Sequence, residues 1–295
     1  MQANSPLRWG VSDILVGRIR MCLLMPDHET YPPYPDSRTC HVGTYRRVLP
    51  VSVERMYENA LDWEHLPHVH AASFKAIERI DAGSWGWRAE TTSARGDRSI
   101  IELRLDRACR RWITRTLKGA NAGSEIWTHA FPIEARRVDI VVDFFVPGVA
   151  ESARKKVGEA FAALYQSLYD EDVAMMTERQ RRLDARIETH AEQERIALGS
   201  RADLALPMQI EFAGRPFVVA EIEGALYAYS AWCPHQMGPL YAAIPEGRLV
   251  TCPWHGYQFN VVDGSCVSGQ SCQLPAPPDV VQDSAGQVFV DFSSR

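Results

Sequence analysis

Short runs in which apolar and polar residues alternate occur at residues 40–51 and again from about residue 73 to residue 147. They include "CHVGTYRRVLPV" (40–51), "WGWRAETTS" (85–93) and "VDIVVDFFVPG" (138–148). Alternation with a period of two places every second side chain on one face, which is the pattern of a half-buried strand. Turn residues such as Gly96-Asp97 separate the runs. Residues 40–51 are therefore predicted to be a strand, and residues 73–147 an antiparallel meander.

Two segments have helical spacing instead. Residues 52–66 ("SVERMYENALDWEHL") begin with a serine that can cap the first turn, and we expect Pro67 to end this helix because proline lacks an amide donor. Residues 151–198 form a longer helical stretch without a proline. A long helix lying across a curved antiparallel sheet is an α+β arrangement that can enclose an apolar cavity.

The pattern changes again after residue 203. Residues 204–295 are rich in Gly, Pro and Val and contain short strand candidates without a convincing helix. We therefore predict an α+β domain over residues 1–195, a linker over 196–203 and an all-β domain over 204–295.

Composition and charge exclude several classes of partner. Among the 295 residues, 46% are hydrophobic and 23% are charged, as in a globular protein with a sizeable core. The net charge of −5 argues against nucleic acid as the main partner. No segment reaches the ~18 apolar residues of a membrane span. Arg18 and Arg20 interrupt the apolar segment 14–25, so neither a signal peptide nor a membrane anchor is expected, and a cytoplasmic location follows.

Two loops near the C-terminus, "CPHQMGPL" (233–240) and "CPWHGYQF" (252–259), each carry a cysteine and a histidine. The four donors are Cys233, His235, Cys252 and His255. This set suits tetrahedral zinc, or a [2Fe-2S] cluster with two cysteines on one iron and two histidines on the other. Prolines and glycines rigidify the loops, so that backbone amides can point at bridging sulfides. The loop chemistry therefore favours the cluster.

The other cysteines give no further metal signal. The chain has seven, and an odd, scattered set is a poor disulfide framework. Cys266 and Cys272 fit no ligand spacing, and we expect them to pack as small hydrophobic residues.

A second group of possible ligands lies in "DWEHLPHVH" (62–70), where Asp62, His65 and His70 follow the spacing D-x-x-H-x-x-x-x-H. Residues five apart lie about 140° apart on an uninterrupted helix, too far round to share one metal. The break at Pro67 can bring His70 back toward His65. Fe(II) oxygenases without heme need two histidines and one carboxylate on one face of the metal.

The carboxylate must come from elsewhere, and the acidic group on the long helix is the best source. Asp172 precedes the apolar residues "VAMM", and an acid beside a buried face is costly unless it is paired or bound to a metal. Asp170 and Glu171 are competing choices. Adventitious zinc binding by the histidines is the alternative.

The two C-terminal loops resemble those of a Rieske iron–sulfur domain, over roughly residues 204–295. The resemblance implies two cysteine ligands on one iron and two histidine ligands on the other, namely Cys233, Cys252, His235 and His255. Respiratory-chain Rieske proteins carry an extra cysteine in each loop, where this chain has Gly238 and Trp254. That difference indicates the lower-potential type found in oxygenases and their ferredoxins.

The N-terminal part resembles the catalytic domain of the Rieske non-heme iron oxygenases. Their signature N-x-x-D-x-x-H-x-x-x-x-H is matched in full by Asn59, Asp62, His65 and His70, and the acid pair of their helix by Glu171-Asp172. The resemblance implies that His65, His70 and Asp172 bind a mononuclear iron. It also implies that Asp62 bridges a cluster histidine and an iron-binding histidine, and that Asn59 lies near the iron.

The order of the two parts is reversed relative to that family, in which the Rieske domain comes first. The chain therefore resembles a permuted oxygenase with a helix-grip-like catalytic domain on the N-terminal side. The family's oxygenases are typically trimers in which the cluster of one subunit serves the iron of its neighbour. A homotrimer is expected, although the new linker leaves transfer within one chain open.

Together the two resemblances imply an oxygenase that uses O2. A separate NAD(P)H-dependent reductase, with or without a ferredoxin, would supply electrons for the hydroxylation or oxidative demethylation of a small, largely apolar, aromatic or cyclic substrate. Mono-oxygenation is favoured over dioxygenation by analogy with single-subunit monooxygenases of the family. The alternatives are a Rieske electron-transfer protein fused to a ligand-binding domain without a second iron, and a zinc-stabilised structural module.

Overall fold

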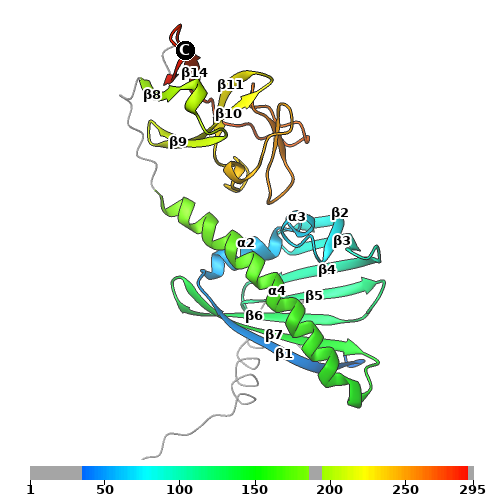
Figure 1. The fold of residues 1–295 in the computed structure, drawn as a ribbon. Coiled ribbons are helices and arrows are strands. Elements are labelled where there is room, and N and C mark those ends of the chain that lie inside the picture. Colours follow the sequence, from blue (N-terminus) through cyan, green and yellow to red (C-terminus); the bar gives the residue numbers. More distant parts are fainter. Residues whose placement is uncertain (1–34, 186–194, 292–295) are drawn as a thin grey trace, which may run out of the picture. The chain divides into compact units, whose positions relative to one another are not determined.

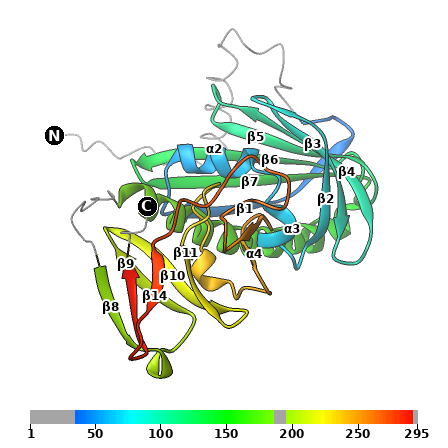
Figure 2. The same ribbon diagram turned by 90° about the horizontal axis from the view of Figure 1, so that it is seen from above.

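The computed structural model describes residues 35–185 and 195–291 (Figures 1 and 2). Contacts among these residues divide the chain into two compact units. Of the described residues, the first unit holds 35–63 together with Ala72–Val173, and the second holds Glu64–Ala71, 174–185 and 195–291. The grouping of Glu64–Ala71 with the C-terminal part is a feature that sequence patterns did not indicate.

A seven-stranded antiparallel sheet forms the body of the first unit, in the order β1-β7-β6-β5-β4-β3-β2. Its strands are β1 (Thr39–Leu49), β2 (Phe74–Gly83), β3 (Gly86–Ser93), β4 (Arg98–Asp106), β5 (Arg111–Lys118), β6 (Glu125–Glu134) and β7 (Arg137–Pro147). Each strand from β2 to β6 pairs with the next one along the chain, which confirms the meander. The pattern missed β2, because nearly all of its side chains are exposed and alternation therefore carries no signal there.

The long helix α4 (Glu151–Asp184) crosses one face of this sheet (Figure 1). Phe144 of β7 is fully buried, and its ring stacks on Phe161 of the helix with centroids 5.2 Å apart. A Cβ atom on Gly158 would lie 2.1 Å from the carbonyl oxygen of Val42, so only glycine permits the helix to approach β1 this closely. The α+β arrangement of a sheet and a long helix is confirmed.

The first helix, α2 (Val53–Leu61), begins as predicted, because the hydroxyl of Ser52 accepts a hydrogen bond from the amide of Arg55 at 3.3 Å. The expectation that Pro67 ends this helix is wrong. The helix ends at Leu61, and Pro67 lies in the first turn of a separate short helix, α3 (Leu66–Val69). A proline is favourable there because first-turn amides have no acceptor inside the helix.

Short strands in three small sheets make up the C-terminal part of the second unit. They are β8 (Arg195–Ser200), β9 (Met208–Phe212), β10 (Arg215–Ile222), β11 (Ala225–Ser230), β12 (Leu249–Thr251), β13 (Gln258–Asn260), β14 (Asp279–Gln282) and β15 (Gln287–Asp291). Residues 195–200, which we assigned mostly to the linker and the long helix, pair as β8 with β15. Ile196 and Leu198 pack on the core around Phe212, which gives this segment a reason to be a strand.

Among the residues that the structure describes, no helix is long and apolar enough to cross a membrane. The longest, α4, has 34 residues, and charged side chains occur throughout it. The apolar segment 14–25, which we expect to be neither a signal peptide nor an anchor, lies outside the described residues.

Candidate metal centres

The two cysteine–histidine loops have the same backbone hydrogen bonds. The first loop follows β11 and the second follows β12. In each, the amide of the cysteine (Cys233 or Cys252) donates to the carbonyl five residues later at 2.8 Å, and its carbonyl accepts from the amide four residues later at 2.9 Å. Those later residues, Met237 and Gly256, both have positive φ angles, of 63° and 67°. The sequence echo is therefore a repeated backbone turn that presents a cysteine and a histidine.

The loops approach each other closely at their cysteines. Cys233 and Cys252 are each 1% exposed. A Cβ atom on Gly238 would lie 2.6 Å from Sγ of Cys252, so glycine is required to leave room for that sulfur. The interaction between the two thiols lowers the pKa of Cys252 and raises that of Cys233, so one member of the pair is favoured as the thiolate, which is the form that binds metals.

The two histidines of these loops also lie together. The rings of His235 and His255 have centroids 4.5 Å apart and an angle of 80° between their planes. Tyr257 stacks on His235 at 4.6 Å and donates its hydroxyl hydrogen to the carboxylate of Glu64 at 2.7 Å. Sequence reasoning missed Tyr257 and Glu64. The sequence feature that could have indicated Tyr257 is its aromatic side chain directly after Gly256 of the second loop.

The pairing of like donors fits a [2Fe-2S] group. The thiols contact one another, and the imidazoles contact one another. A pair of sulfurs and a pair of nitrogens, with Cys252 also interacting with His255, match the requirement of a cluster whose two irons have different ligands. A single zinc ion would instead need all four donors around one point.

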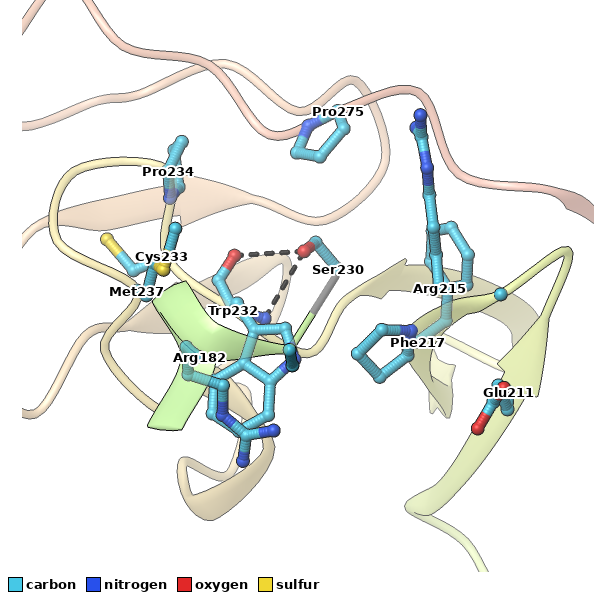
Figure 3. A pocket seen from close by; sticks show the side chains of 13 residues that line it. Arg182, Glu211, Arg215, Phe217, Ser230, Trp232, Cys233, Pro234, Met237 and Pro275 are labelled. Atoms are coloured by element: carbon cyan, nitrogen blue, oxygen red, sulfur yellow. Dashed lines mark hydrogen bonds between the residues drawn. The ribbon is translucent and has the colours of Figure 1, made fainter. Parts of the chain in front are cut away.

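A cavity of about 440 Å³ opens beside the first loop, as Figure 3 shows. Its apolar wall includes Pro216, Phe217, Trp232, Pro234, Met237 and Pro275. The guanidinium of Arg182 lies over the ring of Trp232, 3.2 Å from its centroid, and Arg215 and Glu211 add further charges to the lining. Because Cys233 also lines this cavity, a molecule bound in it would lie directly beside the first loop.

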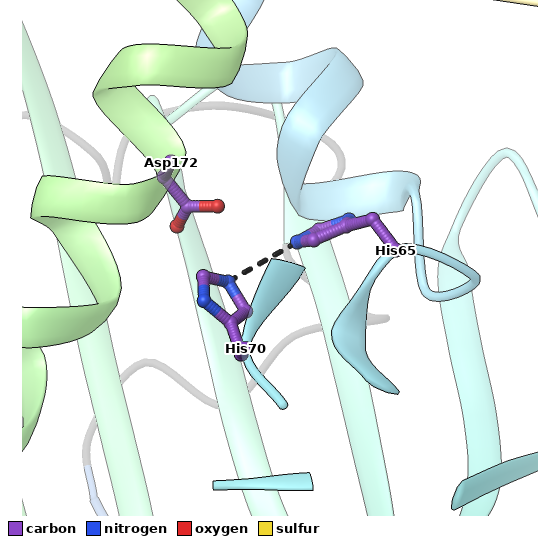
Figure 4. A group of neighbouring side chains, drawn as sticks. All are labelled: His65, His70 and Asp172. Atoms are coloured by element: carbon purple, nitrogen blue, oxygen red, sulfur yellow. Dashed lines mark hydrogen bonds between the residues drawn. The ribbon is translucent and has the colours of Figure 1, made fainter. Parts of the chain in front are cut away.

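His65 and His70 flank α3 as its N-cap and C-cap residues. The short helix between them turns their imidazoles toward each other, with the Nε2 atoms 3.3 Å apart. Both side chains are buried, at 3% and 2% exposure. Asp172 points to the same place from α4, and the ligand atoms of the three residues all lie within 4.8 Å of one another (Figure 4).

Asp172 differs from its two acidic neighbours in burial and in hydrogen bonding. It is 7% exposed, and Oδ1 accepts a hydrogen bond of 2.8 Å from the side-chain amide of Asn59. Asp170 is exposed and forms an ion pair with Arg47 at 2.5 Å, while Glu171 is half-buried. Of the three acids, Asp172 is the one whose surroundings suit a metal ligand.

The spacing of the imidazoles fits a shared metal ion. Two metal–nitrogen bonds of ~2.1 Å that meet at about 100° place their nitrogens ~3.2 Å apart, close to the separation in His65 and His70. Two imidazoles and one carboxylate form the facial set of non-heme Fe(II) oxygenases. Asp62 is the C-cap residue of α2, and its bridging role stays a prediction.

Near Asp172, Tyr169 is buried and Tyr165 is half-buried, and sequence reasoning missed both. Burial raises the pKa of both hydroxyls, and the charge of Asp172 raises it further. The three residues recur at intervals of four and three along α4, so they share one face of the helix. That spacing was the signal that could have found them.

Comparisons with known proteins concern the two parts of the chain separately. A family model described as "Rieske [2Fe-2S] domain" matches residues 194–278. Ferredoxin CarAc of Metapseudomonas resinovorans is 31% identical over 75 residues, which are 25% of this chain and 69% of the ferredoxin. A chain from the complex of reduced oxygenase and oxidized ferredoxin in carbazole 1,9a-dioxygenase is 24% identical, covers 34% of this chain and 94% of its own length, and has a TM-score of 0.30. The ZhuI aromatase/cyclase from Streptomyces sp. R1128 is 15% identical and covers 50% of this chain and 98% of its own length, with a TM-score of 0.40.

Proposed function

The chain belongs to the Rieske [2Fe-2S] domain family through residues 194–278, and from this premise we propose that it is an oxygenase. Its reaction would use O2 and electrons from a separate NAD(P)H-dependent reductase, with or without a ferredoxin between them. The substrate would be small and largely apolar, and its hydroxylation or oxidative demethylation by mono-oxygenation is the favoured outcome. The Rieske resemblance on the C-terminal side of the chain is confirmed by the family match.

Two sets of residues would hold the two metal groups. The cluster ligands would be Cys233, Cys252, His235 and His255, and the iron ligands would be His65, His70 and Asp172. When bound, the cluster supplies single electrons, and the mononuclear Fe(II) supplies the site at which O2 oxidises the substrate.

The observation that carries the proposal is the convergence of His65, His70 and Asp172 in the interior. A carboxylate buried beside two imidazoles is costly unless a cation or hydrogen bonds compensate for lost hydration. Asn59 satisfies one oxygen of Asp172 and holds the carboxylate in one orientation. The chain's own residues thus prepare a two-histidine, one-carboxylate face before any metal binds.

Contacts inside the second unit support electron transfer within one chain. Glu64–Ala71 carries both iron-binding histidines and belongs to the same unit as the cluster loops. The hydroxyl of Tyr257 donates a hydrogen bond to the carboxylate of Glu64. Gly256 has no side chain, and this leaves room for the ring of His68, because a Cβ atom on Gly256 would lie only 2.3 Å from that ring. The homotrimer is a separate proposal that sedimentation or light scattering can test.

Metal analysis of matched variants tests the proposal. Protein purified anaerobically, supplied with ferrous iron and desalted should contain about three irons and two sulfides per chain. Asp172→Ala should lose about one iron, keep both sulfides, and lose substrate oxidation. Asp170→Ala is the matched control, because that exposed acid lies two residues away on the same helix and should keep all three irons.

A second candidate is an electron carrier without a mononuclear iron. It is favoured by the 31% identity to a protein named as a ferredoxin. Two irons with two sulfides in the wild type, unchanged by Asp172→Ala, would establish this alternative. Zinc without sulfide would contradict both candidates.

A further inference from the structure

A hairpin after β13 contains two cysteines that neither metal centre uses. Ser265 pairs antiparallel with Gln273, so Cys266 and Cys272 are the next opposed residues toward the tip. Opposed residues in an antiparallel pair have Cα atoms about 4.5–5.5 Å apart, which lies within the range of about 4.4–6.8 Å seen in disulfides. The backbone therefore places the two cysteines at a distance that a disulfide can span.

The side chains of the two cysteines also lie close together. Each thiol perturbs the other, and their interaction contributes to the lowered pKa of Cys266 and to the raised pKa of Cys272. The first arm of the hairpin is fixed on β13, because the amide of Gln258 donates to the hydroxyl of Ser268 at 3.1 Å. At the tip, nothing lies within 4 Å of the position that a Cβ atom on Gly269 would take. The pair is thus held in place at an open tip that a small reagent can reach.

Cys266 has the surroundings of an attacking thiol. Burial raises its pKa, but hydrogen bonds from the side chain and backbone of Ser268, the backbone of Gln270 and the thiol of Cys272 outweigh burial and leave its pKa below the ordinary value. Its Sγ lies 3.3 Å from Oγ of Ser268. A larger thiolate fraction at Cys266 makes it the expected first nucleophile of the pair.

We propose that Cys266 and Cys272 form a reversible disulfide, a redox modification site separate from both metal centres. In the first step the Cys266 thiolate attacks glutathione disulfide, which forms a mixed disulfide and releases one glutathione thiolate. In the second step the Cys272 thiolate displaces the remaining glutathione and closes the internal S–S bond. The two cysteines lose two electrons and two protons, and one glutathione disulfide becomes two glutathione thiols.

The position of the pair connects it to the cluster side of the unit. Both side chains pack against the buried core that contains Cys233 and Cys252. The disulfide would therefore tie down a hairpin that borders the cluster loops. The proposal does not depend on the iron at Asp172, so the oxygenase and the disulfide can fail independently.

Alkylation mapping of the full-length, cluster-containing protein tests the proposal. The protein is equilibrated without oxygen in glutathione buffers of increasing oxidised fraction, and free thiols are then alkylated. Chymotryptic cleavage after Phe259 and Phe289 yields a peptide whose only cysteines are Cys266 and Cys272. We expect this peptide to carry an internal disulfide, because ring closure is intramolecular. In the same buffers, the fraction of the single thiol Cys40 that carries glutathione should be about tenfold lower than the fraction of the peptide that is oxidised.

Two variants separate a disulfide pair from two independent thiols. Cys272→Ser should leave the mixed disulfide with glutathione on Cys266, since the second step is removed. Cys266→Ser should leave Cys272 free to be alkylated. The proposal is overturned if the wild-type peptide is fully alkylated in every buffer, or if it carries glutathione on both cysteines.

Discussion

The cluster loops and the His–His–Asp site are built in opposite ways. Each loop is a short segment whose backbone hydrogen bonds place its own cysteine, and the second loop repeats the first. The other site joins His65 and His70 to Asp172, which is more than a hundred residues away along the chain. A locally determined site depends on turn geometry, whereas a site assembled from distant elements depends on the packing that holds those elements together.

This comparison indicates which changes should damage one site and spare the other. Changes in the turns should affect the cluster, and changes in the contact between sheet and helix should affect the mononuclear site. Pairs of variants with separate iron and sulfide counts can measure that difference.

The largest expected effect is that of Gly238→Ala. The added methyl group would lie 2.6 Å from Sγ of Cys252, so the loops would have to move apart at the cluster. We expect loss of nearly all sulfide and of the cluster's visible absorption, with iron at Asp172 retained. Gly224→Ala is the control: its φ of 83° costs about 1–2 kcal/mol, but nothing lies within 4 Å of the new methyl group. Equal cluster content in both variants would contradict the prediction.

Phe144→Ala should produce the opposite result. This side chain is fully buried between β7 and α4, so its truncation should lower the free energy of unfolding of the first unit by about 3–5 kcal/mol. The iron bound through Asp172 should weaken while sulfide stays at two per chain. Leu164→Ala, at an exposed position of α4, should change the stability by less than about 0.5 kcal/mol. Denaturant unfolding with metal analysis distinguishes the two.

Acid should destabilise the sheet through His129. Burial, together with the charge of Arg111, lowers the pKa of His129 from 6.5 to about 4. Protons therefore bind more readily to this histidine in the unfolded chain than in the folded one. The stabilisation of the folded state by the neutral histidine is complete above pH 6.5 and is lost as the pH falls toward 4. The loss amounts to about 3 kcal/mol, and His129→Gln should remove it from the pH dependence of unfolding. An unchanged slope between pH 7 and 4 would show that this histidine is not buried in its neutral form.

Ser52→Ala should have the smallest effect. Loss of the cap of α2 should cost about 1 kcal/mol, whereas Ser52→Gly should cost only a few tenths. Because α2 carries Asn59, which holds Asp172, the alanine variant should also bind iron slightly more weakly. Thermal unfolding and iron titration of the two variants provide the measurements. A larger loss of iron with glycine than with alanine would contradict the role of the cap.

Much of the fold could be read from the chain, and the exceptions have physical reasons. Alternation predicted the strands that have one buried face, and it missed β2 because that strand lies at the sheet edge with exposed side chains. Pro67 does not end the first helix: that helix stops at Leu61, and Pro67 lies in the first turn of the separate helix α3, between the two histidines. The segment 195–200, which the pattern divides between the long helix and the linker, is a strand, since pairing with β15 outweighs local propensity.

The sequence by itself determined the residues whose chemistry is local: two Cys/His loops with their glycines and prolines, a capped helix, and two histidines set around a proline. Their spacing along the chain is short, so neighbouring residues suffice to define it. Only the tertiary structure decided that the ligand atoms of His65, His70 and Asp172 lie within 4.8 Å of one another, and that Cys266 and Cys272 oppose each other across a hairpin. Those choices depend on how α4 is rotated on the sheet and on which residues face each other in a turn. Such rotations and registers are set by packing over the whole fold, and a linear pattern does not contain them.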